Sequence, residues 1–351
     1  MFWPVKPVPD PSPAGAAGAP FCDLLLPTGA QLRARTLPGR KVVIVGCGAV
    51  GMACAIAILH RGCQEELVLV DVATDRLEGE VMDLCHGLPF LPRTDLRAGT
   101  VEEEGRDADL VVITAGVAQD PGQSRRELID RNAALFRRIV PPIAAHCPRA
   151  VLLVVSNPVD VLTHIAGQLS GFPPHRVIGS GTVLDSARFR MAISRRLGID
   201  PHDVQAYVIG EHGDSEVPVW SRVEVAGSGL IDGGWEGSRS LDDPELHALF
   251  DSEVRQAAYE IIRRKGSTSW AIGLATAEIV EAVLRSKEQV LTVSSRTHGH
   301  YGLPDVCLSL PTIVSDSGAA ALVRMTLAEQ ETEQLRSSAE LLRVMLDEAG
   351  F

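Results

Sequence analysis

From residue 41 onward, the chain alternates short apolar segments with longer segments whose apolar positions recur about every 3.6 residues. Between the short segments, residues 49–60 and 127–146 have the spacing of amphipathic helices. Strands that are apolar on both faces and joined by helices form a parallel sheet covered on both sides. We therefore expect a doubly wound α/β domain. The short segments are rich in β-branched residues: KVVIV at 41–45, LVLVDV at 67–72, DLVVITA at 109–115 and AVLLVVS at 150–156.

The second half of the chain is less regular, and its clearest elements are helices. Asp243 can cap a helix that has Pro244 at its first position and ends at Gly266. A last helix is predicted to open with a capping box formed by Thr326 and Glu329. The apolar face of that helix consists of Leu335, Ala339, Leu342 and Leu346.

Residues 1–38 are predicted to be an N-terminal extension that is partly disordered. The segment up to residue 39 contains eight of the 22 prolines, and its first 20 residues cannot form a packed element. A mitochondrial transit peptide is the alternative, but Arg33 and Arg35 come late and Ser12 is the only serine. The first ten residues lack the continuous apolar stretch of a signal peptide, so we expect a cytoplasmic protein.

Composition excludes several classes of function. A net charge of -12 and a pI of about 5.3 argue against nucleic acid, because binding to phosphate backbones needs a basic surface. No apolar run approaches the roughly 20 residues of a membrane-spanning helix. The seven cysteines form no CxxC pair and no cluster with histidine at metal-ligand spacing. We expect no membrane, nucleic-acid or metal partner, and reduced thiols.

The first chemical motif is GCGAVG at 46–51, between the strand at 41–45 and the following helix. Such glycines let a backbone approach the pyrophosphate of a dinucleotide at the positive end of a helix dipole, although tight packing alone can also require them. Asp71 ends the next strand, where a carboxylate binds ribose hydroxyls and repels a 2′-phosphate. The motif therefore predicts NAD rather than NADP.

The second motif is GEHGDS at 210–215, which places His212 between glycines and acids outside any helical pattern. This setting suits a catalytic side chain in a cleft, and it suits a surface or core histidine equally well. Oxidation of a 2-hydroxy acid needs a base for the hydroxyl proton, a cation for the carboxylate and a donor that polarises the carbonyl.

Four separated motifs together make the chain resemble the L-lactate dehydrogenase family, within the lactate/malate dehydrogenase fold. They are GCGAVGMA at 46–53, SNPVDVLT at 156–163, GSGTVLDSARFR at 179–190 and GEHGDSEVPVWS at 210–221. The resemblance covers the chain from residue 41 to its end. It implies a Rossmann-type NAD-binding domain at 39–181 followed by an α+β catalytic domain at 182–351.

The resemblance also implies roles for individual residues. His212 is expected to donate and accept the proton, and Asp185 is expected to orient the imidazole ring of His212. Arg188 is expected to bind the substrate carboxylate through a bidentate fork, although an i,i+3 surface ion pair with Asp185 is the alternative. Arg125 resembles the arginine that polarises the C2 oxygen, the alternative being a solvated arginine on a flexible loop. Asn157 is expected to touch both nicotinamide and substrate, and Thr268 is expected to line the substrate pocket.

The cofactor site implied by the resemblance combines the glycine loop with residues that follow the strands. Its members are Gly46, Gly48, Ala49, Val50, Gly51, Asp71, Thr114, Gly116, Asn132 and Asn157. The resemblance further implies a homotetramer, in which residues 21–26 belong to an N-terminal arm that packs on a neighbouring subunit.

Position 119 separates the substrates within this family. Gln119 lies six residues before Arg125, where lactate enzymes have glutamine and malate enzymes have arginine, because only a cation pairs with the second carboxylate of oxaloacetate. Pyruvate and lactate are therefore the expected substrates. Malate dehydrogenase and a non-catalytic paralogue kept for binding or structure are the alternatives. Three departures from the family pattern leave cofactor affinity and turnover open: Ala118, Gln123 and Ser267.

Overall fold

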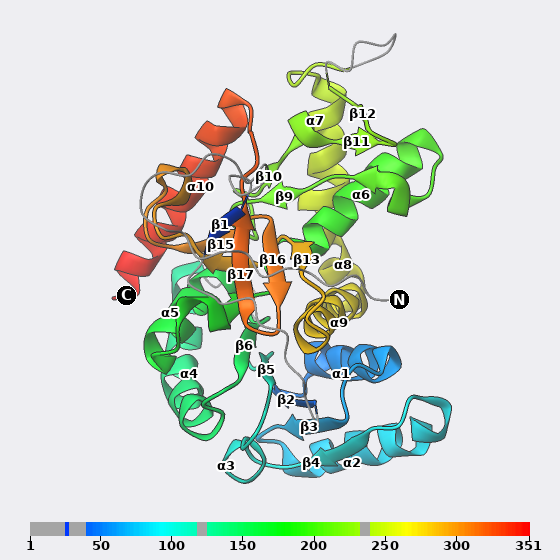
Figure 1. The fold of residues 1–351 in the computed structure, drawn as a ribbon, viewed down its shortest axis with the longest axis vertical. Helices are drawn as coiled ribbons and strands as arrows, with labels where there is room; N and C mark the ends of the chain where they lie inside the picture. The colour runs from blue at the N-terminus through cyan, green and yellow to red at the C-terminus, as the bar shows by residue number, and fades with distance from the viewer. Residues whose placement is uncertain (1–24, 28–39, 118–124, 232–238) are drawn as a thin grey trace, which may run out of the picture.

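The computed structural model describes residues 25–27, 40–117, 125–231 and 239–351. Its centre is an eight-stranded sheet, in which the six strands contributed by residues 41–179 are parallel. Their order is β4-β3-β2-β5-β6-β7, so the chain starts in the middle, moves to one edge and then fills the other side (Figure 1). The strands are β2 (Lys41–Val45), β3 (Glu66–Val70), β4 (Asp95–Ala98), β5 (Leu110–Ile113), β6 (Val151–Val154) and β7 (Val177–Gly179).

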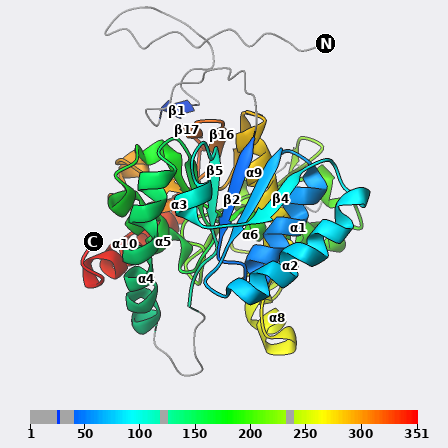
Figure 2. The ribbon, with the colours of Figure 1, turned by 90° about the horizontal axis from the view of Figure 1, so that it is seen from below.

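Helices cover both faces of this sheet, which confirms the predicted doubly wound domain. Figure 2 shows α1 and α2 on one side of the strands and α3, α4 and α5 on the other. Every residue of β2, β5 and β6 is buried, as continuous apolar strands in a parallel sheet require. The helices are α1 (Ala49–Arg61), α2 (Thr74–Gly87), α3 (Val101–Glu104), α4 (Arg125–His146) and α5 (Val159–Ser170).

The second half of the chain continues the same sheet and adds smaller ones. Two antiparallel strands, β14 (Ser294–Arg296) and β15 (Cys307–Ser309), extend it beyond β7. The small sheets contain β8 (Val204–Gln205), β9 (Val208–Ile209), β10 (Val217–Pro218), β11 (Glu224–Val225), β12 (Ser228–Gly229), β13 (Gln289–Leu291), β16 (Thr312–Ser315) and β17 (Gly318–Val323). Its helices are α6 (Val183–Leu197), α7 (Pro244–Phe250), α8 (Ala257–Lys265), α9 (Trp270–Leu284) and α10 (Glu329–Glu348).

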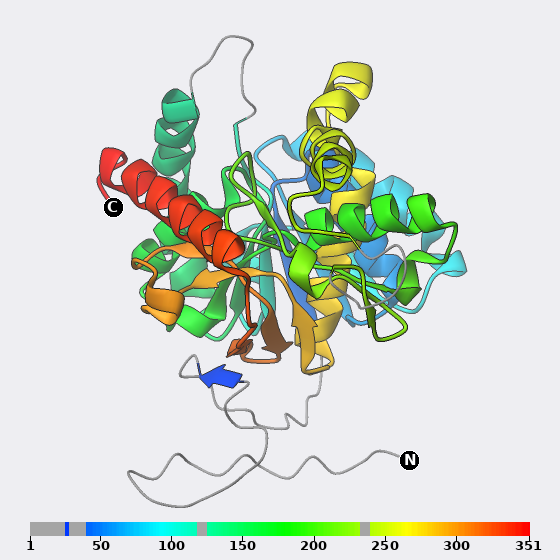
Figure 3. The same cartoon turned by 90° about the horizontal axis from the view of Figure 1, so that it is seen from above.

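Two helix predictions for this half differ from the structure in detail. The helix from Pro244 to the left-handed Gly266 is divided by a π-helical turn at Asp251–Arg255, although Asp243 caps it as expected. The predicted capping box of the last helix is wrong. Ala328 is the N-cap, and the Glu331 carboxylate accepts from its backbone N–H at 2.9 Å, so only this half of a capping box forms, two residues further along. Figure 3 shows α10, in red, on the outside of the molecule.

The N-terminal arm was expected on a neighbouring subunit. In the single chain, β1 (Leu25–Pro27) pairs antiparallel with β17 of the same chain. The rest of the predicted arm, residues 21–24, lies outside the described residues. Among the residues that are described, no helix is long and apolar enough to cross a membrane.

Candidate active site

The glycine loop follows β2, beside the point where the order of strands reverses between β2 and β5. Gly46 has a φ of +96°, and a Cβ there would stand 2.4 Å from the backbone nitrogen of Ala115. A Cβ at Gly51 would stand 2.0 Å from the carbonyl oxygen of Gly46. These two glycines are therefore required by the packing of the loop itself. Ligands of doubly wound sheets bind at such a reversal, outside the carboxyl ends of the strands.

Gly48 differs from its neighbours because its missing side chain faces open space. A Cβ at Gly48 would have nothing within 4 Å. Gly48 is also the N-cap of α1, where no side chain of the described residues caps the helix and the first turn holds no acid. The backbone N–H groups of Ala49, Val50 and Gly51 form this first turn, and their dipoles favour an anion. The loop therefore fits the pyrophosphate of a dinucleotide.

Asp71 connects the glycine loop to the residues after β3. Its carboxylate accepts from the backbone N–H of Cys47 at 2.6 Å and from that of Ala73 at 2.9 Å. A carboxylate has about four lone-pair sites, so capacity remains for ribose hydroxyls. Burial and the nearby Asp71 charge raise the pKa of the Cys47 thiol to about 12, which leaves it protonated and unreactive.

The remaining predicted cofactor residues lie after β5 and β6, next to the glycine loop. The Thr114 hydroxyl donates to the carbonyl of Gly46. A Cβ at Gly116 would stand 3.4 Å from the side-chain oxygen of Asn132. Asn132 is fully buried. Its side-chain oxygen accepts from the backbone N–H of Val117, and its side-chain nitrogen donates to the carbonyls of Val117 and Asn157, the latter at 3.3 Å. Asn132 therefore ties the two loops together from beneath and does not face the solvent.

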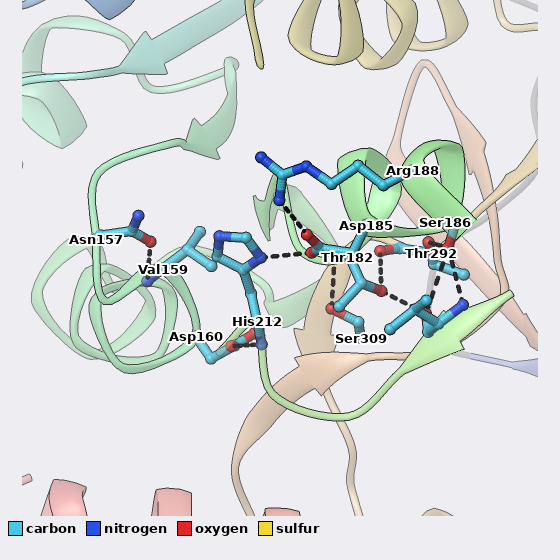
Figure 4. A network of polar contacts seen from close by, with 11 residues as sticks. Asn157, Val159, Asp160, Thr182, Asp185, Ser186, Arg188, His212, Thr292 and Ser309 are labelled. Atoms are coloured by element: carbon cyan, nitrogen blue, oxygen red, sulfur yellow. Dashed lines mark hydrogen bonds and ion pairs between the residues drawn. The ribbon is translucent and has the colours of Figure 1, made fainter. Parts of the chain in front are cut away.

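The fold brings together His212 and Asp185, to which the resemblance assigns the exchange of the proton. Their side chains meet at 2.5 Å between His212 Nδ1 and Asp185 Oδ2, and Asp185 Oδ1 accepts from Arg188 at 2.8 Å. Figure 4 shows His212 and Arg188 converging on the carboxylate. Asp185 and Arg188 are one turn apart on α6, yet their side chains are only 2% and 14% exposed, so the pair is not the surface ion pair considered as an alternative.

A network of hydroxyl groups fixes the first turn of α6 beneath this cluster. The Thr182 backbone N–H donates to Ser309 Oγ at 3.0 Å, and the hydroxyl groups of Ser186 and Thr292 are 3.1 Å apart. Ser186 also accepts from the backbone N–H of Val208 at 2.9 Å, which attaches α6 to the strand leading to His212 (Figure 4). The 3.6-residue repeat of α6 then directs Asp185 and Arg188 to the same side.

The charges of the cluster shift the pKa values of its members. Burial alone would raise the pKa of Asp185, but His212 and Arg188 hold it below its ordinary value. Burial opposes the charge of His212, but the Asp185 carboxylate, with a contribution from Asp160, raises the pKa of the imidazole to about 9. An ionised Asp185 accepts the proton on Nδ1, which leaves Nε2 as the nitrogen that exchanges a proton.

Two acidic residues of the site escaped the sequence analysis. Asp160, on α5, accepts from the backbone N–H of His212 at 2.7 Å, and Glu211 forms an ion pair with Arg125 at the start of α4. Both belong to motifs quoted above, and Asp160 interrupts an apolar run, which is a signal for a buried polar role. Burial raises the pKa of Asp160 to about 6 despite its hydrogen bonds.

Other predicted residues are placed less centrally. Within the described residues, Arg125 bonds to Glu211 and not to the cluster around His212. Asn157 accepts from the backbone N–H of Val159, and Thr268 lies half-buried with Ser267 between α8 and α9. Gln119, Ala118 and Gln123 lie outside the described residues. No three His, Cys, Asp or Glu side chains of the described ranges gather as metal ligands.

Comparisons with known proteins agree with this arrangement along both halves of the chain. Residues 40–179 match the model of the lactate/malate dehydrogenase NAD-binding domain, and residues 182–350 match that of the family's α/β C-terminal domain. An L-lactate dehydrogenase of Synechococcus sp. (strain JA-3-3Ab) is 50% identical over 309 residues, which are 88% of this chain and 98% of that protein. The L-lactate dehydrogenase B-B chain of Danio rerio is 46% identical over 87% of this chain and 91% of its own.

A solved structure gives the same result in three dimensions. The crystal structure of a lactate dehydrogenase from a Medee basin deep-sea metagenome library has a TM-score of 0.85 and 42% identity, covering 90% of this chain and 100% of that one. The two matched ranges meet at the candidate site, where the backbone N–H of His212 in the second donates to Asp160 in the first at 2.7 Å. With a glycine loop for a dinucleotide and a paired histidine in the expected order, the chain belongs to the lactate/malate dehydrogenase family.

Proposed function

We propose that this chain is an NAD-dependent L-lactate dehydrogenase that interconverts pyruvate and (S)-lactate. The observation that carries the proposal is the His212–Asp185–Arg188 cluster, which has a buried carboxylate at its centre, in a chain that also has a glycine loop suited to a dinucleotide. Relatives described as L-lactate dehydrogenases, which are 46–50% identical over most of this chain, support lactate over malate, as does the glutamine at position 119.

The cofactor is held by the glycine loop and by the loops after β3, β5 and β6. Asp71 favours NAD over NADP, because a second negative charge at the ribose would meet its carboxylate. When bound, the cofactor supplies the hydride in reduction and accepts it in oxidation. Asn132 supports these loops through the backbone contacts described above. The residues proposed to line the site are Gly46, Gly48, Ala49, Val50, Gly51, Asp71, Thr114, Gly116 and Asn157.

The side chains of the site have separate tasks in the reduction of pyruvate. Arg188 binds the carboxylate, and Asp185 keeps the guanidinium and the imidazole in place. His212 Nε2 donates a proton to the C2 oxygen as the hydride reaches C2, so the ketone becomes an alcohol and the imidazole becomes neutral. Oxidation of lactate reverses each transfer. Arg125 stabilises the charge on the C2 oxygen, and Asn157 and Thr268 complete the pocket together with Gln119.

We also propose a cytoplasmic homotetramer whose cofactor and catalytic domains comprise residues 39–181 and 182–351. The six cysteines within the described ranges are free thiols, as in a reducing compartment. Trp270 and Leu274 expose apolar side chains on one face of α9, which supports association between subunits.

Oxidation of NADH, followed by absorbance with pyruvate or oxaloacetate as substrate, tests the function. We expect a higher kcat/KM for pyruvate, and we expect His212→Asn to lower kcat by about 10²- to 10⁴-fold while NADH still binds. A preference for oxaloacetate would indicate a malate dehydrogenase. NADH binding without turnover of either oxoacid would support the non-catalytic alternative.

A further inference from the structure

Glu211 is a buried carboxylate directly before His212, and the proposed reaction gives it no task. Its side chain is 2% exposed. One carboxylate oxygen accepts from the guanidinium of Arg125, and the other accepts from the hydroxyl of Ser215. Its backbone N–H donates to Ser338 Oγ on α10 at 2.9 Å, and the hydroxyl groups of Ser215 and Ser338 are 3.0 Å apart. Glu211 is thus fixed from several sides.

Arg125 is much less constrained than its partner. It is the first residue of α4, and its side chain is 38% exposed, so the guanidinium can leave Glu211 by rotation about its own bonds. The carboxylate cannot follow, because it accepts from the Ser215 hydroxyl and because Ser338 holds the backbone N–H of Glu211. Arg125 is therefore the mobile member of the ion pair.

Gly213 shows how closely the ion pair packs against the catalytic loop. An ideal Cβ at Gly213 would stand 3.0 Å from Glu211 Oε1 and 3.1 Å from Arg125 Nη2. Contacts of this length are tighter than most real Cβ atoms make, so a larger residue would press the two charged groups apart. The pair therefore lies against the residue that follows His212.

A guanidinium paired with a carboxylate polarises a carbonyl poorly, because the nearby negative charge offsets its field. We infer that Glu211 is a positioning residue that holds Arg125 in the free protein and competes with the C2 oxygen of the substrate for it. This inference rests on the proposed role of Arg125 in pyruvate reduction. Pyruvate then binds productively only in the fraction of molecules whose Arg125 has left Glu211, and the apparent affinity falls by that fraction.

Glu211→Gln tests the competition, because the amide keeps the size of the side chain and an oxygen for Ser215 but loses the charge. We expect the kcat/KM for pyruvate to rise about fivefold or more, mainly through a lower KM, while the affinity for NADH is unchanged. In an Arg125→Gln background the same substitution should change kcat/KM by less than twofold. A decrease by the same factor in both backgrounds would overturn the inference, because it would assign Glu211 a structural role only.

A second measurement needs no substrate, so it separates this inference from the proposed function. In urea unfolding of the cofactor-free protein, Glu211→Gln and Arg125→Gln should each lower the midpoint, and the double variant should unfold close to the single ones. If the decrease in the midpoint of the double variant equals the sum of the two single decreases, the two side chains do not interact and the ion pair is contradicted. Gly213→Ala provides an independent variant that separates the charges without removing either, and it should raise kcat/KM in the same direction as Glu211→Gln. Failure of the unmodified chain to reduce pyruvate would refute the proposed function and, with it, the competition, but not the ion pair.

Discussion

Burial and several carboxylates act on the charge of His212. Burial opposes its positive charge, while the carboxylates of Asp185, Asp160 and Glu216 favour it and bring the pKa of the imidazole to about 9. Asp185 bonds the ring itself, and Asp160 bonds the backbone of the same residue. The two acids therefore have separable effects: one fixes the orientation of the ring, and the other fixes the loop and adds charge nearby.

The pH dependence of the two directions follows from this pKa. Reduction needs the imidazolium, so kcat/KM for pyruvate should fall as pH rises through about 9, whereas kcat/KM for lactate should rise through the same range. Asp160→Asn removes a carboxylate that raises the pKa of His212, so both midpoints should move to lower pH. Initial rates between pH 6 and pH 10 measure the shift. Unchanged midpoints in a folded variant would show that Asp160 does not act on the imidazole.

The sequence predicted the pairing of His212 with Asp185 because both lie in recognisable motifs. It did not predict the contact between Asp160 and His212, which are 52 residues apart, or that between Arg125 and Glu211, which are 86 apart. Local patterns do not encode which distant acid approaches a given cation, because packing of α4, α5 and the catalytic loop decides this. Spacing alone likewise gave no sign that Asn132 is fully buried.

Two glycines of the GxGxxG pattern in the loop before α1 serve different purposes: one is needed for packing and the other leaves space for a ligand. Gly51 is needed for the turn to pack, whereas Gly48 leaves space in front of α1. Its backbone is extended, with φ of -73° and ψ of -167°, so alanine can adopt it without strain. Two neighbouring substitutions should therefore have different effects.

Gly48→Ala should leave the free energy of unfolding nearly unchanged but weaken NADH binding about tenfold or more, because the new methyl group would occupy the open space that lets a pyrophosphate approach the loop. Gly51→Ala should instead destabilise the fold by about 1–3 kcal/mol, because its Cβ would meet the carbonyl oxygen of Gly46. Urea unfolding and NADH fluorescence titration of both variants measure the contrast. Equal losses of NADH affinity at equal stability would contradict the separation.

Element types were predicted well where the periodicity was strong, and element ends were predicted less well. The strand expected at 109–115 is regular only over Leu110–Ile113, because the chain leaves the sheet at Thr114 to form the loop that contacts Gly46. Glu331, and not Glu329, bonds the backbone of the N-cap, and its carboxylate also accepts from Ser221 at 2.6 Å, in a distant part of the chain. Tertiary contacts therefore select the helix start from several local candidates.

For the whole molecule, the packing of α9 on α1 fixes the second half of the chain against the cofactor domain. A Cβ at Gly273 would stand 2.5 Å from the carbonyl oxygen of Ala53, so the two helix backbones approach closely. Arg61 on α1 pairs with Glu278 at 2.5 Å and with Glu281 at 2.6 Å on α9. Thr268, which we propose to line the substrate pocket, precedes α9 by two residues, so the packing of α9 on α1 restricts its position relative to the cofactor domain.

The outer face of α9 leads to the last prediction, which concerns assembly. Trp270 and Leu274 are one turn apart and 69% and 59% exposed in the single chain, and apolar side chains of this size are usually covered in an assembly. Light scattering of the native protein should give about four times the 37.6 kDa mass of the chain. Leu274→Glu should reduce that mass, because association would bury a carboxylate without a partner.

Val344 on α10 provides the matched control, because its apolar side chain is 53% exposed but lies on another helix. Val344→Glu adds the same charge and should leave the mass unchanged. Circular dichroism of both variants checks that each chain is folded before the masses are compared. A monomeric mass for the unmodified protein would refute the tetramer. An undiminished mass for folded Leu274→Glu would show that this face of α9 is not part of the interface, because burial of an unpaired carboxylate there would weaken association.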